Sequence, residues 1–140
     1  MLALPFGWAT PVAAAAHRRE LTTRLSRTTH GAPEAIISAC VVAEMAAWAI
    51  EQHPIDAVVA AGVREADHLA WLYVLPPAAL QPLQQAASGE WTPSTAAMAP
   101  DATTTVASVL YVLREARNLV SAMLQPTSHG CLESSGLNQR

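Results

Sequence analysis

The chain has 140 residues, enough for one domain with a moderate core and too few for a second. Hydrophobic residues make up 51% of it, with abundant Ala and only 5% aromatic residues, a balance that favours closely packed helices over a sheet. The net charge of −3, with no basic stripe along any helix, excludes an extended nucleic-acid surface, so we expect no nucleic-acid partner.

Charged residues are sparse, at 14% of the chain, and two interpretations of this remain open. In the first, other protein covers part of the surface. In the second, the composition reflects genomic bias, since all eight basic residues are Arg. Four of these arginines gather between positions 18 and 27 and are interleaved with Glu20. We interpret them as a solvated helix face: Arg18, Arg19, Arg24 and Arg27.

The two cysteines and the apolar runs bear on the cellular compartment of the protein. Cys40 lies in an apolar helical run and Cys131 in polar sequence, with no disulfide or metal-binding pattern, which is typical of the reducing cytoplasm. No basic segment precedes the apolar residues Val12–Ala16, which argues against a signal peptide. The longest apolar run, Ala35–Ile50, is short for a membrane span and contains Glu44. We therefore expect a cytoplasmic protein without membrane contact.

The first half of the chain predicts one irregular segment and three helices. Residues 1–10, broken by Pro and Gly, predict an irregular or partly extended entry. A helix is expected over 12–27 and ends before Gly31. Pro33 and Glu34 mark the start of a long helix that runs to about residue 51. Another is expected over 55–75, softened at Gly62. The apolar positions expected to face the core are Ile36, Ile37, Cys40, Val41, Met45, Trp48, Val58, Val59, Val63, Leu69 and Leu72.

The second half predicts shorter helices and one long loop. We expect a short helix over 78–87 and a loop over 90–102, which is longer than a simple connection requires. A strong helix follows over 103–116, with Val106, Val109, Leu110 and Leu113 facing the core. Residues 119–124 predict another short helix, and the tail beyond is expected to fray.

Three stretches, in this order, resemble the ADP-ribosylglycohydrolase family. The first is Met1-Leu2-Ala3-Leu4-Pro5-Phe6-Gly7, where Leu2 replaces the usual Arg. The second is Thr29-His30-x-x-Pro33, similar to the family's Thr-His-x-x-Pro motif at the start of a central helix. The third joins Trp91-Thr92-Pro93 to residues 99–106. The resemblance covers residues 1–130 and implies an all-α, irregular helical bundle equivalent to the later part of a family member, with residues 131–140 as a disordered tail.

The resemblance also implies a two-metal hydrolase, and the family's metal-binding residues are altered here. Where the family has Gly-Gly-Asp-x-Asp-Ser/Thr, this chain has Leu132 and Ser134 in place of the two aspartates. Its three aspartates, Asp56, Asp67 and Asp101, form no Asp-x-Asp pair. Mg²⁺ or Mn²⁺ is expected for a full-length member, whereas this chain alone is expected to bind no metal, because a hard cation needs several clustered oxygens.

The candidate substrate-binding residues are Thr29, His30 and Trp91. His30 precedes a helix start, where it could receive phosphate or ribose hydroxyls, or it simply caps the turn by bonding backbone. Trp91 could stack on an adenine or ribose face, or it anchors the packing of its loop. Thr103, Thr104 and Thr105 offer hydroxyls, one of which N-capping explains. We assign no catalytic residue; His129 and Cys131 lack an orienting carboxylate.

The resemblance therefore implies a protein related to enzymes that cleave the glycosidic bond of ADP-ribosylated substrates, incomplete and inactive alone. A missing N-terminal half, or self-association, would then cover its exposed apolar faces. The alternative is a non-catalytic helical interaction or oligomerisation module that reuses this fold. A small helical domain with an accidental likeness is a third interpretation, which three motifs in family order disfavour.

Overall fold

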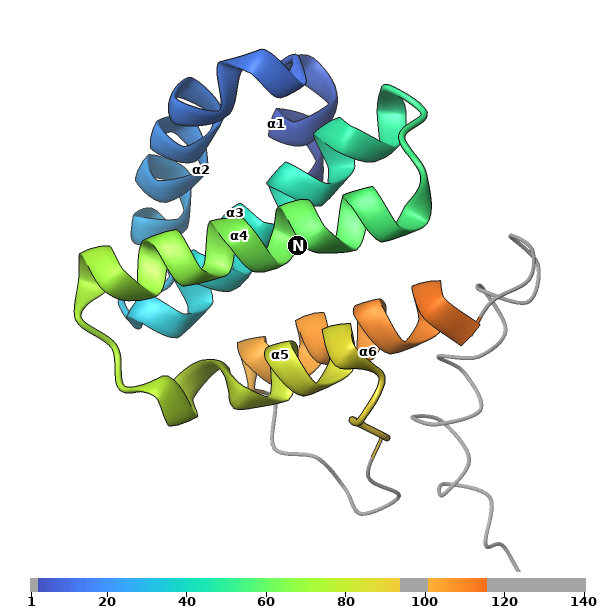
Figure 1. The fold of residues 1–140 in the computed structure, drawn as a ribbon. Coiled ribbons are helices and arrows are strands. Elements are labelled where there is room, and N and C mark those ends of the chain that lie inside the picture. Colours follow the sequence, from blue (N-terminus) through green and yellow to red (C-terminus); the bar gives the residue numbers. More distant parts are fainter. Residues whose placement is uncertain (1–2, 94–100, 116–140) are drawn as a thin grey trace, which may run out of the picture.

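The computed structural model in Figure 1 describes residues 3–93 and 101–115. Over these residues the chain forms α-helices and short 3-10 turns and no strand, which confirms the all-α prediction. The elements in chain order are α1 (Leu4–Ala9), η1 (Val12–Ala14), α2 (Ala15–Thr29), α3 (Pro33–Ile50), α4 (Ile55–Tyr73), η2 (Pro77–Leu80), α5 (Gln81–Ser88) and α6 (Ala102–Glu115).

The expectation of an irregular entry over residues 1–10 is wrong, because Leu4–Ala9 form α1. Pro5 occupies the first turn of this helix. Backbone N–H groups in the first turn have no hydrogen-bond partner within the helix, so the absence of one in proline does no harm there. Gly7 is buried against α3, and a methyl group on it would collide with the Ala43 carbonyl oxygen and the Ala46 side chain. These residues therefore bring two helix backbones into close contact and do not break α1.

Helix α3 is the centre of the domain and contacts α1, α2, α4 and α6. Its residues from Ile36 to Met45 are almost all buried, and of the predicted face only Trp48 remains partly exposed. Pro33 begins the helix and Pro54 lies just beyond its end, as the sequence predicts. By length and composition, α3 alone among the described helices could cross a membrane; a buried core helix meets the same criterion.

Helix α4 crosses α3 and is continuous through Gly62, where softening was predicted. Gly62 faces Met45, and a Cβ at this position would lie 2.7 Å from the Met45 Cγ and Sδ atoms. The glycine therefore leaves room for the Met45 side chain between α3 and α4, and a larger residue would make that side chain move. Val58, Val59 and Leu69 are buried as predicted, whereas Leu72 is 57% exposed and was wrongly assigned to the core side.

Helices α5 and α6 lie side by side below α4 in Figure 1. Pro82 is accommodated in the first turn of α5, and Gly89 ends that helix with a positive φ of 87°. In α6, Val106 and Leu110 are buried, whereas Val109, predicted to face the core, is 40% exposed. The loop residues 94–100, the predicted helix over 119–124 and the altered motif around residue 131 lie outside the described residues.

The arginines between positions 18 and 27 do not form a single solvated face. Arg18 is 1% exposed and pairs with Glu44 of α3, and Arg19 donates to the Glu65 carboxylate of α4 at 2.6 and 2.7 Å. Hydrogen bonding to Glu65 is the main reason why the pKa of Arg19 is raised. Only Arg24 and Arg27 are exposed as expected. The sequence does not show which side of α2 meets carboxylates on other helices.

Candidate functional site

The turn between α2 and α3 presents the Thr29-His30 pair. Helix α2 ends at Thr29, and the His30 backbone N–H closes its last turn by donating to the Ser26 carbonyl oxygen at 2.8 Å. The chain is extended at His30 and turns back into α3 at Pro33. The fixed φ of Pro33 suits the first position of a helix, so the local sequence sets this reversal.

The His30 ring bonds to a neighbouring hydroxyl and not to backbone. Its Nδ1 atom lies 2.7 Å from Thr29 Oγ1, which also lies 3.3 Å from the Ser26 carbonyl oxygen. If Thr29 donates to that carbonyl, His30 Nδ1 carries the proton and Nε2 is an acceptor; otherwise Nε2 carries it and is a donor. In both arrangements Thr29 orients the imidazole, and Nε2 has no partner among the described residues.

On the opposite side, Asp101 caps the start of α6. Its carboxylate accepts hydrogen bonds from the Thr103 hydroxyl at 2.5 Å, the Thr104 N–H at 3.1 Å and the Thr104 hydroxyl at 2.7 Å. Partial burial by itself raises the pKa of Asp101, but these hydrogen bonds outweigh it and leave the pKa below its ordinary value. The N-capping side chain is therefore Asp101. The prediction that capping explains a hydroxyl of Thr103, Thr104 or Thr105 is wrong, because these residues lie within α6 and their side chains do not cap it.

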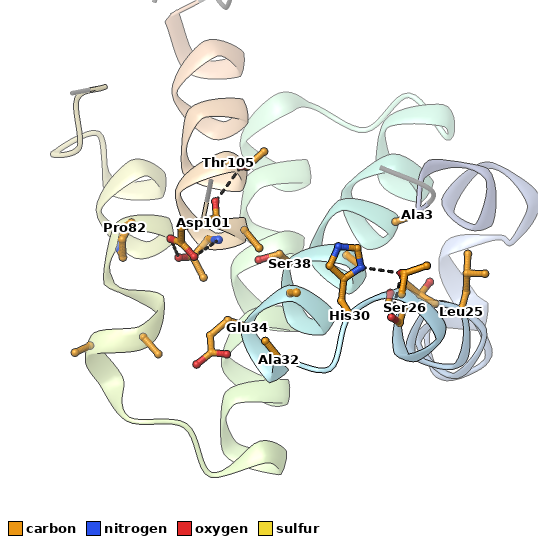
Figure 2. Close-up of a pocket in the computed structure, with 18 residues that line it drawn as sticks. Ala3, Leu25, Ser26, His30, Ala32, Glu34, Ser38, Pro82, Asp101 and Thr105 are labelled. Atoms are coloured by element: carbon orange, nitrogen blue, oxygen red, sulfur yellow. Dashed lines mark hydrogen bonds between the residues drawn. The ribbon is translucent and has the colours of Figure 1, made fainter. Parts of the chain in front are cut away.

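A cavity of about 910 Å³ lies between these two features (Figure 2). All three stretches that resemble the ADP-ribosylglycohydrolase family contribute to its lining. Ala3 comes from the first stretch, Thr29 and His30 from the second, and Asp101 and Thr105 from the third. Segments that are up to about a hundred residues apart in sequence therefore line the same cavity.

The cavity lining combines small apolar side chains with a few polar ones. Alanines of α3, η2 and α6 form much of its surface, together with Pro82. Among the described residues that line it, Glu34 and Asp101 are the carboxylates, His30 is the one basic side chain, and there is no Arg. Its volume lies within the range of about 300–1,000 Å³ usual for small-molecule sites.

Thr22 of α2 and Ser38 of α3 are among the cavity residues that were not identified from the sequence. A signal for the first was present, because Thr22, Ser26 and Thr29 are spaced at i, i+4 and i+7 and therefore share one helix face. Ser38 carried no such signal, since it lies within the long apolar run of α3.

Trp91 is not part of this cavity lining. It is partly buried against the hydrophobic core, and its ring contacts Tyr111 edge-on at a centroid distance of 6.2 Å. This contact corresponds to the packing interpretation. A ligand-stacking role for Trp91 stays a prediction, and the structure does not bring it together with Thr29 and His30.

The carboxylates of this region do not fit the family's divalent ions. No group of three or more His, Cys, Asp or Glu side chains within residues 3–93 and 101–115 could hold a metal ion. Asp101 is already committed to the hydroxyls and amides of its own helix start. Mg²⁺ and Mn²⁺ need at least one or two uncommitted carboxylates beside their other oxygen ligands, and the described residues do not gather such a set.

Comparison with known proteins identifies the family of the chain. Searches of curated proteins and of solved structures gave no match. A family model described as ADP-ribosylglycohydrolase matches residues 1–131, nearly the whole chain. The chain therefore belongs to the ADP-ribosylglycohydrolase family.

Proposed function

We propose that the cavity binds the ADP-ribosyl group of a modified substrate, the kind of substrate that family membership implies. The observation that supports this most is the convergence of all three family-like stretches on one cavity, although they are distant in sequence. A pocket of this size with a few convergent polar groups is the usual form of a small-molecule site.

His30 and Thr29 are the residues proposed to contact the ligand. Because Thr29 holds Nδ1, the ring presents Nε2 in a fixed orientation to a ribose hydroxyl, which both donates and accepts hydrogen bonds. A hydroxyl therefore suits either tautomer of His30.

Hydrolysis is proposed to require carboxylates that this chain does not supply by itself. The family's reaction is metal-dependent cleavage of the glycosidic bond of ADP-ribosylated substrates. Asp56, Asp67 and Asp101 are well separated in sequence, and the family resemblance implies that Leu132 and Ser134 stand where the family has paired aspartates. We therefore expect residues 1–140 alone to bind the ligand without turning it over, with further oxygen ligands supplied from outside these residues.

Titration calorimetry with ADP-ribose tests the binding proposal. The wild-type chain should bind it, and His30→Ala should weaken binding by about three- to tenfold, the usual value of one hydrogen bond. His17→Ala is the matched control, because His17 is exposed on α2 and does not line the cavity. No binding by the wild type, or equal losses in both variants, would contradict the proposal.

A second assay tests self-sufficiency. The purified chain, with Mg²⁺ or Mn²⁺, should release no ADP-ribose from ADP-ribosyl-arginine above the rate without protein. Metal-dependent turnover by this chain alone would overturn the proposed need for outside carboxylates, whatever the binding result.

An exposed apolar surface favours a second function, a helical interaction module that associates with itself. At the end of α4, three large apolar side chains are exposed: Trp71 at 78%, Leu72 at 57% and Val74 at 87%. Val74 also adopts a positive φ of 53°, which β-branched residues rarely take. Sedimentation velocity should show association that Trp71→Ser abolishes and Trp8→Ser, on α1, does not. A wild-type monomer at high concentration would exclude this function.

A further inference from the structure

Two buried hydroxyls in the cavity lining have no hydrogen-bond partner within the described part of the chain. They are Thr22 Oγ1 and Ser38 Oγ, on residues that are 1% and 3% exposed. Both residues line the cavity, and Ser38 lies on α3 between the His30 and Asp101 sides in Figure 2. An unpaired buried hydroxyl costs about 1–3 kcal/mol, so folded proteins seldom keep one without a use.

Three other hydroxyls around the cavity already have a partner. Thr103 donates to the Asp101 carboxylate, Thr105 to the Asp101 carbonyl oxygen at 2.9 Å, and Thr29 contacts the Ser26 carbonyl oxygen. The two buried hydroxyls without a partner therefore both lie on the side of the cavity formed by α2 and α3. Because a Ser or Thr hydroxyl both donates and accepts, either one could pair with a ligand hydroxyl or a ring nitrogen.

The charge of the lining limits which part of a ligand enters. Glu34 and Asp101 place negative charge on the cavity wall, and the lining residues that the structure describes include no Arg to neutralise a phosphate. Like charges repel, so these two carboxylates disfavour a diphosphate there. The small alanine side chains leave room for a flat, uncharged ring.

From these observations we infer that Thr22 and Ser38 hydrogen-bond the uncharged nucleoside end of the ligand, whose phosphates remain outside the cavity. This inference rests on the proposed function for the identity of the ligand and adds its orientation and two specificity-determining residues.

Calorimetry with adenosine, ADP-ribose and inorganic pyrophosphate tests the inference. Adenosine should bind, pyrophosphate should neither bind nor compete with it, and Thr22→Val and Ser38→Ala should each weaken adenosine binding by about five- to tenfold. Each substitution removes an unpaired hydroxyl, so the melting temperature should stay equal or rise. Thr28→Val and Ser88→Ala are matched controls, because both residues are exposed and outside the cavity lining. They should change affinity by less than about twofold.

The outcomes separate this inference from the proposed function. Unchanged adenosine and ADP-ribose binding in both variants would overturn the inference and leave the proposed function standing. Competition between pyrophosphate and adenosine would overturn the orientation. Adenosine binding that depends on Thr22 and Ser38, without any ADP-ribose binding, would support the inference and overturn the proposed function. If neither nucleoside ligand binds, both fail.

Discussion

Arg18 of α2 and Glu44 of α3 form an ion pair whose side chains are only 1% and 11% exposed. The guanidinium group also donates to the Pro11 carbonyl oxygen at 2.8 Å, and Glu44 accepts from the Trp48 indole N–H at 2.9 Å. The pair therefore joins the segment before α2 to the central helix. Buried charges are tolerated when they are paired and hydrogen-bonded in this way.

Breaking this pair should be strongly destabilising. Glu44→Gln leaves the Arg18 charge buried without its counter-charge, and we expect the free energy of unfolding to fall by about 3–5 kcal/mol. Urea denaturation followed by circular dichroism measures it. Arg24→Ala, which removes a 74% exposed partner of Glu20, is the control and should cost less than about 1 kcal/mol. Similar losses in both variants would argue against a dominant buried pair.

Two glycines should respond in opposite directions to the same substitution. Gly7→Ala places a methyl group against Ala43 and should destabilise the fold by about 1–3 kcal/mol. Gly31→Ala meets no atom within 4 Å and its φ is not positive, so it should be neutral or stabilising by up to about 1 kcal/mol. Thermal melts of the two variants, compared with wild type, check this. A tolerated Gly7→Ala would contradict the close α1–α3 contact.

Burial should make the Cys40 thiol unreactive. Burial raises the pKa of Cys40 from its ordinary value of 9.0 to about 11, so at pH 8 only about one thiol in a thousand is ionised. In a Cys131→Ser variant, Ellman's reagent should label the native protein slowly and the urea-unfolded protein quickly. Because the folded state holds this proton more tightly, stability should fall as the pH rises from 9 through about 11. Rapid labelling of native protein at pH 8 would refute the buried position.

The Asp101 cap should contribute stability that depends on pH. Its folded-state pKa lies below the ordinary 3.8, so its contribution is fully present above about pH 4 and is lost as the pH falls through the lower value. At pH 7, Asp101→Ala should cost about 0.5–2 kcal/mol, and the difference from wild type should shrink in acid. Asp56→Ala is the control, since Asp56 lies in the first turn of α4 without a capping bond, and should cost about 0.3–1 kcal/mol. A loss from Asp101→Ala that is constant from pH 7 to pH 3 would show that its charge is not involved.

Helix positions were predictable wherever Pro, Gly and apolar spacing agreed. Helix α3 begins at Pro33 and ends within one residue of the predicted limit, because start and stop signals bracket a continuous apolar face. Helix α1 was missed because Pro5 and Gly7 are ordinary helix breakers. A proline in the first turn and a glycine pressed against another helix are both compatible with a helix, but only their surroundings reveal it.

The candidate site was predictable only in part, for a similar reason. The Thr29-His30 pair could be identified because its motif is contiguous in sequence. Thr22 and Ser38 could not, because what distinguishes them is a buried hydroxyl without a hydrogen-bond partner in the cavity wall, and partners are set by tertiary packing.

The sequence by itself determined the helical class and the family, because local propensity and residue order are properties of the chain. Tertiary structure alone decided that Ala3, His30 and Asp101 line one cavity, and that Arg18 is buried against Glu44. Those relationships depend on how helix faces meet, and the same amphipathic helices could satisfy their own hydrogen bonds and apolar spacing in several mutual orientations.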